Sequence, residues 1–144
     1  MIQALKGLLL ISFLFGLIAC EAEKDNARFN EQRYFFLEAL KQVEAGGRQL
    51  QNGNLAQAEM TAALDNLDQG LKLAFEVQRP FLDEIDLRLG KNFERYFVKG
   101  VEHYRIGIEA ADQEQQLAGL QLLQKWSQFW QAEQNLIMSR LNPE

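Results

Sequence analysis

Residues 29–50 read FNEQRYFFLEALKQVEAGGRQL and repeat a large apolar side chain every seven positions. The repeating residues are Phe29, Phe36, Val43 and Leu50. Seven residues are close to two helical turns, so these side chains form one stripe along a helix. The stretch therefore predicts an amphipathic helix, which we extend from about residue 23 to residue 51.

A second and a third helix are predicted at about residues 55–77 and 81–110. Asn52-Gly53-Asn54 divides the first helix from the second, because glycine accepts a positive φ and Asn54 can cap exposed N–H groups. Pro80 suits the first turn of the third helix. The residues expected to face inward from these two helices are Met60, Ala63, Leu67, Leu71, Ala74, Phe75, Leu82, Ile85, Leu89, Phe93, Tyr96, Phe97, Val101, Tyr104 and Ile108.

Two glycines interrupt the apolar pattern of the third predicted helix. Gly100 and Gly107 each cost a helix interior about 1 kcal/mol relative to alanine. Either a neighbouring helix packs unusually close to them, or the helix bends.

A fourth helix is predicted from Gln113 to Leu141, after a turn and cap at Ala111-Asp112. Its inward residues are expected to be Leu117, Leu120, Leu123, Trp130, Ile137 and Leu141, with Trp126, Phe129 and Leu136 on an adjoining face. Long helices joined by short turns favour antiparallel neighbours. The expected fold is therefore all-α, an antiparallel up-down-up-down four-helix bundle after a cleaved signal peptide.

The amino-terminal segment has the layout of a secretory signal. Lys6 precedes an uncharged, apolar run over residues 7–19. The run is too short to cross a bilayer core of about 30 Å, which takes about 20 helical residues. It ends in Leu17-Ile18-Ala19-Cys20, which resembles the lipobox of bacterial lipoproteins.

The resemblance to bacterial lipoproteins implies cleavage between Ala19 and Cys20 and acylation of Cys20, for example with palmitate. Several acyl chains would anchor the protein firmly, since each buried methylene contributes about 0.8 kcal/mol. Glu21 takes the place of the aspartate that retains such proteins in the inner membrane. We therefore expect an outer-membrane anchor on the periplasmic face, with the inner membrane as the alternative. The predicted divisions are a signal peptide at 1–19, a lipidated spacer at 20–28 and a helical domain at 29–144.

Charge and cysteine content exclude several kinds of partner and site. Cleavage would remove Lys6 and take the net charge from −5 to −6. Nucleic acids and anionic lipid head groups attract basic surfaces, so no nucleic-acid partner is expected and the membrane is reached through the lipid on Cys20. Because Cys20 is the single cysteine, the mature domain has no disulfide, thiol nucleophile or cysteine-based metal or haem site.

No set of residues in the sequence predicts catalysis. His103 is the single histidine, and a lone helical histidine is more often a packing residue than a ligand. The sequence lacks the Glu-x-x-His motif of di-iron bundles. Gly46-Gly47 lies within a helical pattern and lacks the lysine and strand of a phosphate-binding loop. We therefore predict a non-enzymatic protein with no metal and no cofactor.

Aromatic residues provide the candidate for a functional surface. They gather in three groups at residues 34–36, 93–97 and 126–130. Trp126, Phe129 and Trp130 form the candidate partner patch, because tryptophan is enriched at binding hot spots. The alternative is that these rings close the corners of the bundle.

Two functions follow from these features. The first is a lipoprotein that faces the periplasm and binds another envelope protein as an assembly or stabilising factor. The second is a carrier of a small apolar molecule or lipid, in a bundle cavity lined by Gly100, Gly107 and facing rings. A catalytic function would require polar side chains with shifted pKa values around His103.

Overall fold

The computed structural model describes residues 23–51 and 54–143 with their side chains, and residues 2–22 as helical backbone alone. The predicted cleavage and lipidation residues, Ala19 and Cys20, lie outside the residues described with side chains. Asn52 and Gly53 of the predicted turn also lie outside the described residues.

The chain divides into two units, Met1–Glu31 and Gln32–Glu144. In the first unit, residues 23–28 are helical and exposed. Within the described part of the chain, no helix is both long and apolar enough to cross a bilayer.

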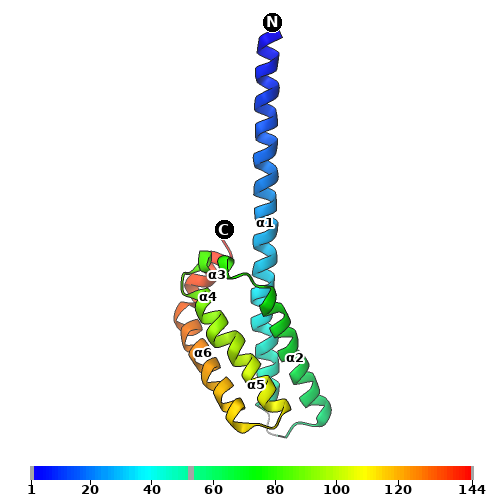
Figure 1. Ribbon diagram of the computed structural model, residues 1–144, viewed down its shortest axis with the longest axis vertical. Coiled ribbons are helices and arrows are strands. Elements are labelled where there is room, and N and C mark those ends of the chain that lie inside the picture. The colour runs from blue at the N-terminus through cyan, green and yellow to red at the C-terminus, as the bar shows by residue number, and fades with distance from the viewer. Residues whose placement is uncertain (1, 52–53, 144) are drawn as a thin grey trace. The chain divides into compact units, whose positions relative to one another are not determined.

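The structure consists of helices and short connections (Figure 1). The elements are α1 (Ile2–Leu50), α2 (Gln57–Glu76), α3 (Arg79–Ile85), α4 (Leu89–Asn92), the π-helix η1 (Phe93–Val98), α5 (Lys99–Glu109) and α6 (Gln113–Leu141). No strand occurs among the described residues, which confirms the all-α class. The predicted end of the first helix and both ends of the second and fourth helices lie within two residues of those observed.

The single helix predicted over residues 81–110 is wrong, because the chain leaves the helical conformation at Asp86. Asp86 has φ −155° and ψ 131°, and its carboxylate accepts a hydrogen bond from the backbone N–H of Arg88 at 2.9 Å. A side-chain acceptor of this kind competes with the helical carbonyl groups for N–H donors. α3 therefore ends at Ile85, and the helical path resumes in α4 at Leu89.

The capping residue at the start of α2 also differs from the prediction. Ala56, not Asn54, precedes the helix, and Glu59 Oε2 accepts from the backbone N–H of Ala56 at 2.9 Å. The glutamate in the first turn therefore caps the helix, and not the asparagine that precedes it. The other two predicted starts are confirmed, since Pro80 lies in the first turn of α3 and the Asp112 carboxylate caps α6.

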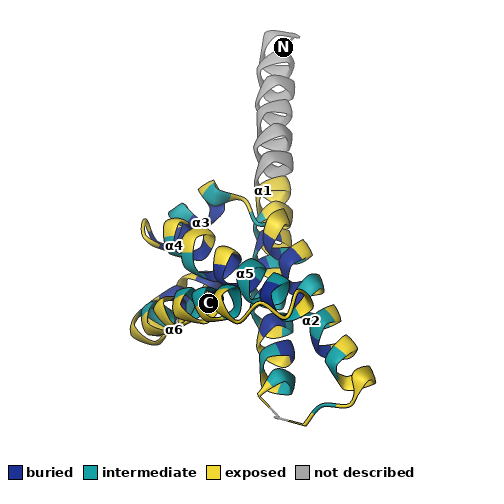
Figure 2. Ribbon diagram, turned by 60° about the horizontal axis from the view of Figure 1, so that its bottom comes forward, coloured by how far each residue is buried: buried dark blue, intermediate teal, exposed yellow. Residues whose placement is uncertain are grey.

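The core of the second unit is built from apolar stripes on each helix, and Figure 2 shows buried residues recurring along α1 and α2. The side chains that are at most 1% exposed are Phe36, Ala39, Ala63, Leu67, Leu82, Leu89, Phe93, Val101, Ile137 and Leu141. Phe75, which was predicted to face inward, is 64% exposed. The buried stripe of α2 runs through Leu71 and Ala74, and Phe75 lies about 100° further around the helix.

One buried polar side chain joins α1 to the turn after α2. Gln32 is 3% exposed. Its Nε2 donates to the carbonyl of Glu76 at 3.1 Å, and its Oε1 accepts from the backbone N–H of Gln78 at 2.6 Å. Both ends of the buried amide are therefore satisfied, as burial requires.

The glycines of α5 mark a close contact with α6. A Cβ atom on Gly107 would lie 2.5 Å from the backbone nitrogen of Gln116, and one on Gly100 would lie 2.9 Å from Leu123. The first of the two explanations for these glycines, a close neighbour, is therefore confirmed.

α6 is turned differently from the prediction. Leu117 and Leu120 are 57% and 46% exposed, although both were expected to face inward, whereas Trp126 is only 7% exposed. Gly119 fixes this orientation, because it lies against the backbone of Tyr104 without room for a side chain. The buried face of α6 is thus determined by a glycine, and a prediction based on large apolar side chains does not take glycines into account.

Candidate functional site

Aromatic side chains from α1, η1 and α6 meet in one cluster. Its members are Phe36, Phe93, Phe97, Trp126, Phe129 and Trp130. Phe93 and Phe97 stack with ring centroids 5.0 Å apart, and Trp126 and Trp130 stack at 5.6 Å. Phe36 lies 5.3 Å from Phe93 and 5.9 Å from Trp130. Such ring pairs contribute about 0.5–1.5 kcal/mol each beyond their buried area, so the cluster ties the three elements together.

The residues of the candidate partner patch belong to this cluster. Trp126 is 7% exposed, and Phe129 and Trp130 are half-buried. Trp126 is therefore an interior residue rather than the centre of an exposed patch. The guanidinium of Arg88 lies 5.9 Å from the ring centroid of Phe129 and covers part of it. Trp130 remains accessible from a neighbouring groove.

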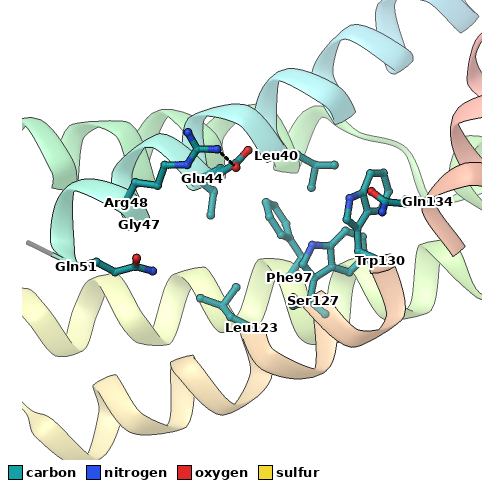
Figure 3. A pocket seen from close by; sticks show the side chains of 12 residues that line it. Leu40, Glu44, Gly47, Arg48, Gln51, Phe97, Leu123, Ser127, Trp130 and Gln134 are labelled. Atoms are coloured by element: carbon teal, nitrogen blue, oxygen red, sulfur yellow. Dashed lines mark hydrogen bonds and ion pairs between the residues drawn. The ribbon is translucent and has the colours of Figure 1, made fainter. Parts of the chain in front are cut away.

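This groove, which we call the α1–α6 groove, lies between the two helices and has a volume of about 740 Å³ (Figure 3). Its lining consists of Leu40, Val43, Glu44, Gly47, Arg48 and Gln51 from α1, Phe97 from η1, and Leu123, Trp126, Ser127, Trp130 and Gln134 from α6. Ligand sites in proteins commonly occupy about 300–1,000 Å³. The groove is therefore large enough for several apolar side chains or a small molecule.

The lining divides into an apolar floor and a polar rim. Phe97 and the two tryptophans form the floor, whereas Gln51 and Ser127 are exposed along the edges. The charged lining residues are Glu44 and Arg48, which form an ion pair with each other. Because these charges cancel, the groove as a whole carries no net charge.

Gly47 leaves part of the groove wall open. A Cβ atom on Gly47 would meet nothing within 4 Å, whereas one on the preceding Gly46 would lie 2.8 Å from the carbonyl oxygen of Ala63 on α2. Packing against α2 explains why Gly46 is a glycine. No contact within the described residues explains Gly47, which faces the groove instead.

The π-helix η1 carries part of the groove floor. π-helical segments are rare and often occur at functional sites. Phe93 and Phe97, four residues apart on η1, stack with their ring planes 13° apart, and Phe97 reaches the groove. The irregular helix therefore presents one ring to the core and its neighbour to the groove.

Asp86 is the buried centre of a partly exposed ionic cluster away from the groove. It is 9% exposed, its carboxylate contacts Arg88 and lies 3.8 Å from Arg140, and Arg88 also pairs with Glu133 at 2.9 Å. Burial raises the pKa of Asp86, but hydrogen bonds from Arg88 and the charges of Arg88 and Arg140 outweigh burial and lower it. The carboxylate is therefore ionised at neutral pH and suited to joining the turn after α3 to α6.

His103 and the predicted cavity do not form a site together. His103 is half-buried on α5, and no group of His, Cys, Asp and Glu among the described residues is placed to hold a metal ion. The space beside Gly100 and Gly107, expected to be a cavity, is filled by Leu123 and Gln116 of α6.

A second hollow of about 410 Å³ lies between α2, α3, η1 and the start of α5. The exposed ring of Phe75 is at its edge. The charged residues of its lining are paired, since Arg79 pairs with Asp83 at 2.9 Å and with Glu94 at 2.6 Å, and Lys99 pairs with Glu102 at 3.3 Å. This hollow is therefore the weaker candidate for a binding site.

The α1 wall of the groove, Ser127 and Gln134 were not predicted as site residues from the sequence, although Val43 was predicted on the apolar stripe of its helix. The one local signal was the Gly46-Gly47 pair inside a helical pattern, which close packing against α2 explains only in part.

No protein-family model matches the chain, and neither a curated protein nor a solved structure is significantly similar to it. The groove and the amino-terminal motif are therefore the features from which a function is inferred.

Proposed function

We propose that the mature chain is a lipid-anchored, non-enzymatic envelope protein whose helical domain binds another envelope protein as an assembly or stabilising factor. The observation that carries this proposal is the α1–α6 groove, with its aromatic floor and a solvent-facing polar rim that carries no net charge. Desolvated pockets lined by tryptophan are typical of binding hot spots. The proposed contact residues are Leu40, Gly47, Leu123, Ser127 and Trp130, above Phe97 and Trp126.

The shape of the groove favours a protein segment over a carried small molecule. Sites for small molecules commonly enclose most of their ligand. Here Glu44, Arg48, Gln51 and Ser127 are all exposed, so the groove opens to solvent along its edges. A protein segment can fill such a groove with one face while its other face stays in water.

A small apolar molecule or lipid is the second candidate occupant. The apolar floor and the volume of about 740 Å³ favour it. Mass spectrometry of an organic extract of the purified protein tests this alternative, because a carrier would release one stoichiometric compound that a groove-filling variant lacks.

The proposed location is the periplasmic face of the outer membrane, with the inner membrane as the alternative. Its support is the lipobox-like Leu17-Ile18-Ala19-Cys20 followed by Glu21. The acidic net charge leaves the lipid on Cys20 as the means of membrane attachment.

We also propose that the domain is an up-down-up-down antiparallel four-helix bundle, in which the path from α3 to α5 counts as the third helix. Connections of a few residues between consecutive helices support this topology, as do the contacts of α5 with α2 and with α6.

Photo-crosslinking in the cell envelope tests the proposed function. A photoreactive phenylalanine at Gln134, on the α6 wall of the groove, is expected to give a discrete cross-linked species, and the same group at the exposed Gln128 is not. Gly47→Phe, which fills the groove from the opposite wall, should abolish the species. Equal cross-linking from both positions, or none from Gln134, would contradict the proposal.

A further inference from the structure

We infer that the α1–α6 groove binds an amphipathic α-helix of about four turns, with an uncharged apolar face, from a partner protein. The inference rests on the proposed function, since it names the form of the segment that occupies the same groove. Five properties of the walls support it: their hydrogen-bonding capacity, their residue spacing, their small residues, their charge and their length.

The walls offer an extended peptide few backbone partners. Both walls are helices, whose own N–H and C=O groups are paired within the helix, and no strand edge exists among the described residues. The floor consists of aromatic rings. An extended segment would lose hydrogen bonds to water there without replacing them, whereas a helix satisfies its own backbone.

The spacing of the wall residues matches that of helices packed against a third helix. The α6 wall residues Leu123, Ser127, Trp130 and Gln134 follow one another at intervals of four, three and four. The α1 wall residues Leu40, Glu44, Gly47 and Gln51 show the same intervals. Alternating steps of three and four place side chains in one row along a helix, and two such rows facing a shared trough accept the knobs of another helix.

Small residues occur midway along both rows. Gly47 has no side chain, and Ser127 on the opposite wall has a short one. Helix axes usually approach to about 8–10 Å, and the distance depends on the side chains at the contact. The open space at Gly47 therefore allows the occupant helix to lie deep enough to reach the rings of the floor.

Charge limits the chemistry of the occupant. Glu44 and Arg48 neutralise each other, and the remaining lining residues are uncharged. A charged side chain placed over Trp126 and Trp130 would lose hydration without an unpaired counter-charge. The face that enters the groove is therefore apolar, with neutral polar residues where it meets Gln51 and Gln134.

The length of the α6 wall sets the length of the occupant. Leu120 is outside the groove lining, but it is 46% exposed and lies one turn before Leu123, so it continues the row of α6 wall residues at the same spacing. From Leu120 to Gln134 a helix rises about 21 Å at 1.5 Å per residue, which corresponds to an occupant of about 14 residues.

Selection from a library of random 16-residue peptides displayed on phage tests the inference. The mature chain in nanodiscs serves as the target, and its Gly47→Phe variant serves for counter-selection. Enriched peptides are expected to carry apolar residues at i, i+3, i+4 and i+7. A synthesised representative should bind wild type and lose affinity by about tenfold or more against Gly47→Phe, against Ser127→Trp, or when its central residue is proline.

Gln128→Phe is the matched control, because it adds the same ring to an exposed position of α6 outside the groove. It should bind the peptide as wild type does, and circular dichroism should show equal helix content in all variants. Ser127→Trp blocks the groove from the other wall, so the test stands even if Gly47→Phe folds poorly. Enriched peptides without helical periodicity, binding that survives the proline, or no enrichment over the counter-selected variant would each overturn the inference.

The two proposals fail separately. Helical peptides that bind the groove, together with no photo-cross-link in the envelope, would leave the inference standing and remove the proposed function. A cross-linked partner that is displaced only by extended peptides would leave the proposed function standing and remove the inference of a helical occupant.

Discussion

At the scale of single residues, the adjacent glycines of α1 show how position decides what a missing side chain does. Gly46 faces Ala63 and Leu67 of α2 and permits the two helices to touch, whereas Gly47 faces the open groove. Both glycines lower the stability of the helix, because glycine loses more conformational entropy on folding than other residues do. At Gly46 this entropic cost is offset by the close packing of α1 against α2, whereas at Gly47 no packing contact offsets it.

Replacing each glycine by alanine should therefore change stability in opposite directions. Gly47→Ala is expected to raise the free energy of unfolding by about 0.5–1 kcal/mol, because alanine favours the helix and its methyl group meets no atom. Gly46→Ala should lower it, because the new Cβ would lie 2.8 Å from the carbonyl oxygen of Ala63. Urea denaturation of both variants checks this. A gain in both, or a loss in both, would show that the two sites are not distinguished by packing.

At the scale of helices, local signals predicted ends well where the capping chemistry was itself local. Asp112 and Pro80 act within a few residues of where they stand, and α6 and α3 begin where these residues predict. The break after α3 could not be predicted in this way. The conformation of Asp86 is supported by Arg140, 54 positions later in the chain, and by Arg88, which is itself held by Glu133.

The Asp86 cluster should make stability depend on pH. The folded-state pKa of Asp86 lies below its ordinary value of 3.8, so the ionised form stabilises the fold above that pH, and the contribution is lost as the pH falls through the folded-state pKa. Asp86→Asn keeps an acceptor for the Arg88 N–H but removes the charge. It should lower the free energy of unfolding at pH 7 by about 1–3 kcal/mol, with a smaller deficit in acid.

Denaturation of wild type and Asp86→Asn between pH 7 and pH 3 measures this deficit. Asp65→Asn, on the exposed side of α2, is the control and should show little change. A deficit that stays constant down to pH 3 would mean that the side chain acts through shape or hydrogen bonding and not through its charge.

The groove lay beyond sequence-based prediction because it depends on two helices that are distant in the chain. Leu40 and Gly47 come 80 to 90 residues before Ser127 and Trp130, and the apolar periodicity of one helix does not indicate how far it lies from another helix. The face of α6 was misjudged for a related reason. Its contact with α5 is made by Gly119, so the leucines that the pattern placed inside, Leu117 and Leu120, remain exposed.

At the scale of the whole molecule, the proposed membrane attachment and the proposed partner binding belong to two different parts of the chain, Cys20 and the α1–α6 groove. The net charge of −5 argues against attraction to anionic membrane surfaces, so the proposed membrane attachment depends on the proposed lipid. The groove can then have an apolar floor and no net charge without serving as a membrane-binding surface. The two functions should accordingly be separable by mutation.

The anchor gives the last prediction, which concerns Glu21. The resemblance to bacterial lipoproteins implies that aspartate directly after the acylated cysteine retains the protein in the inner membrane. Wild type expressed in an enteric host should therefore fractionate with the outer membrane on a density gradient, and Glu21→Asp should move it to the inner membrane. Glu23→Asp makes the same chemical change two residues later and should leave the location unchanged.

Because Glu21→Asp leaves the groove untouched, purified protein should still bind the selected helical peptides as wild type does. Inner-membrane location of wild type would reject the outer-membrane assignment, and loss of peptide binding would mean that anchor and groove are not independent.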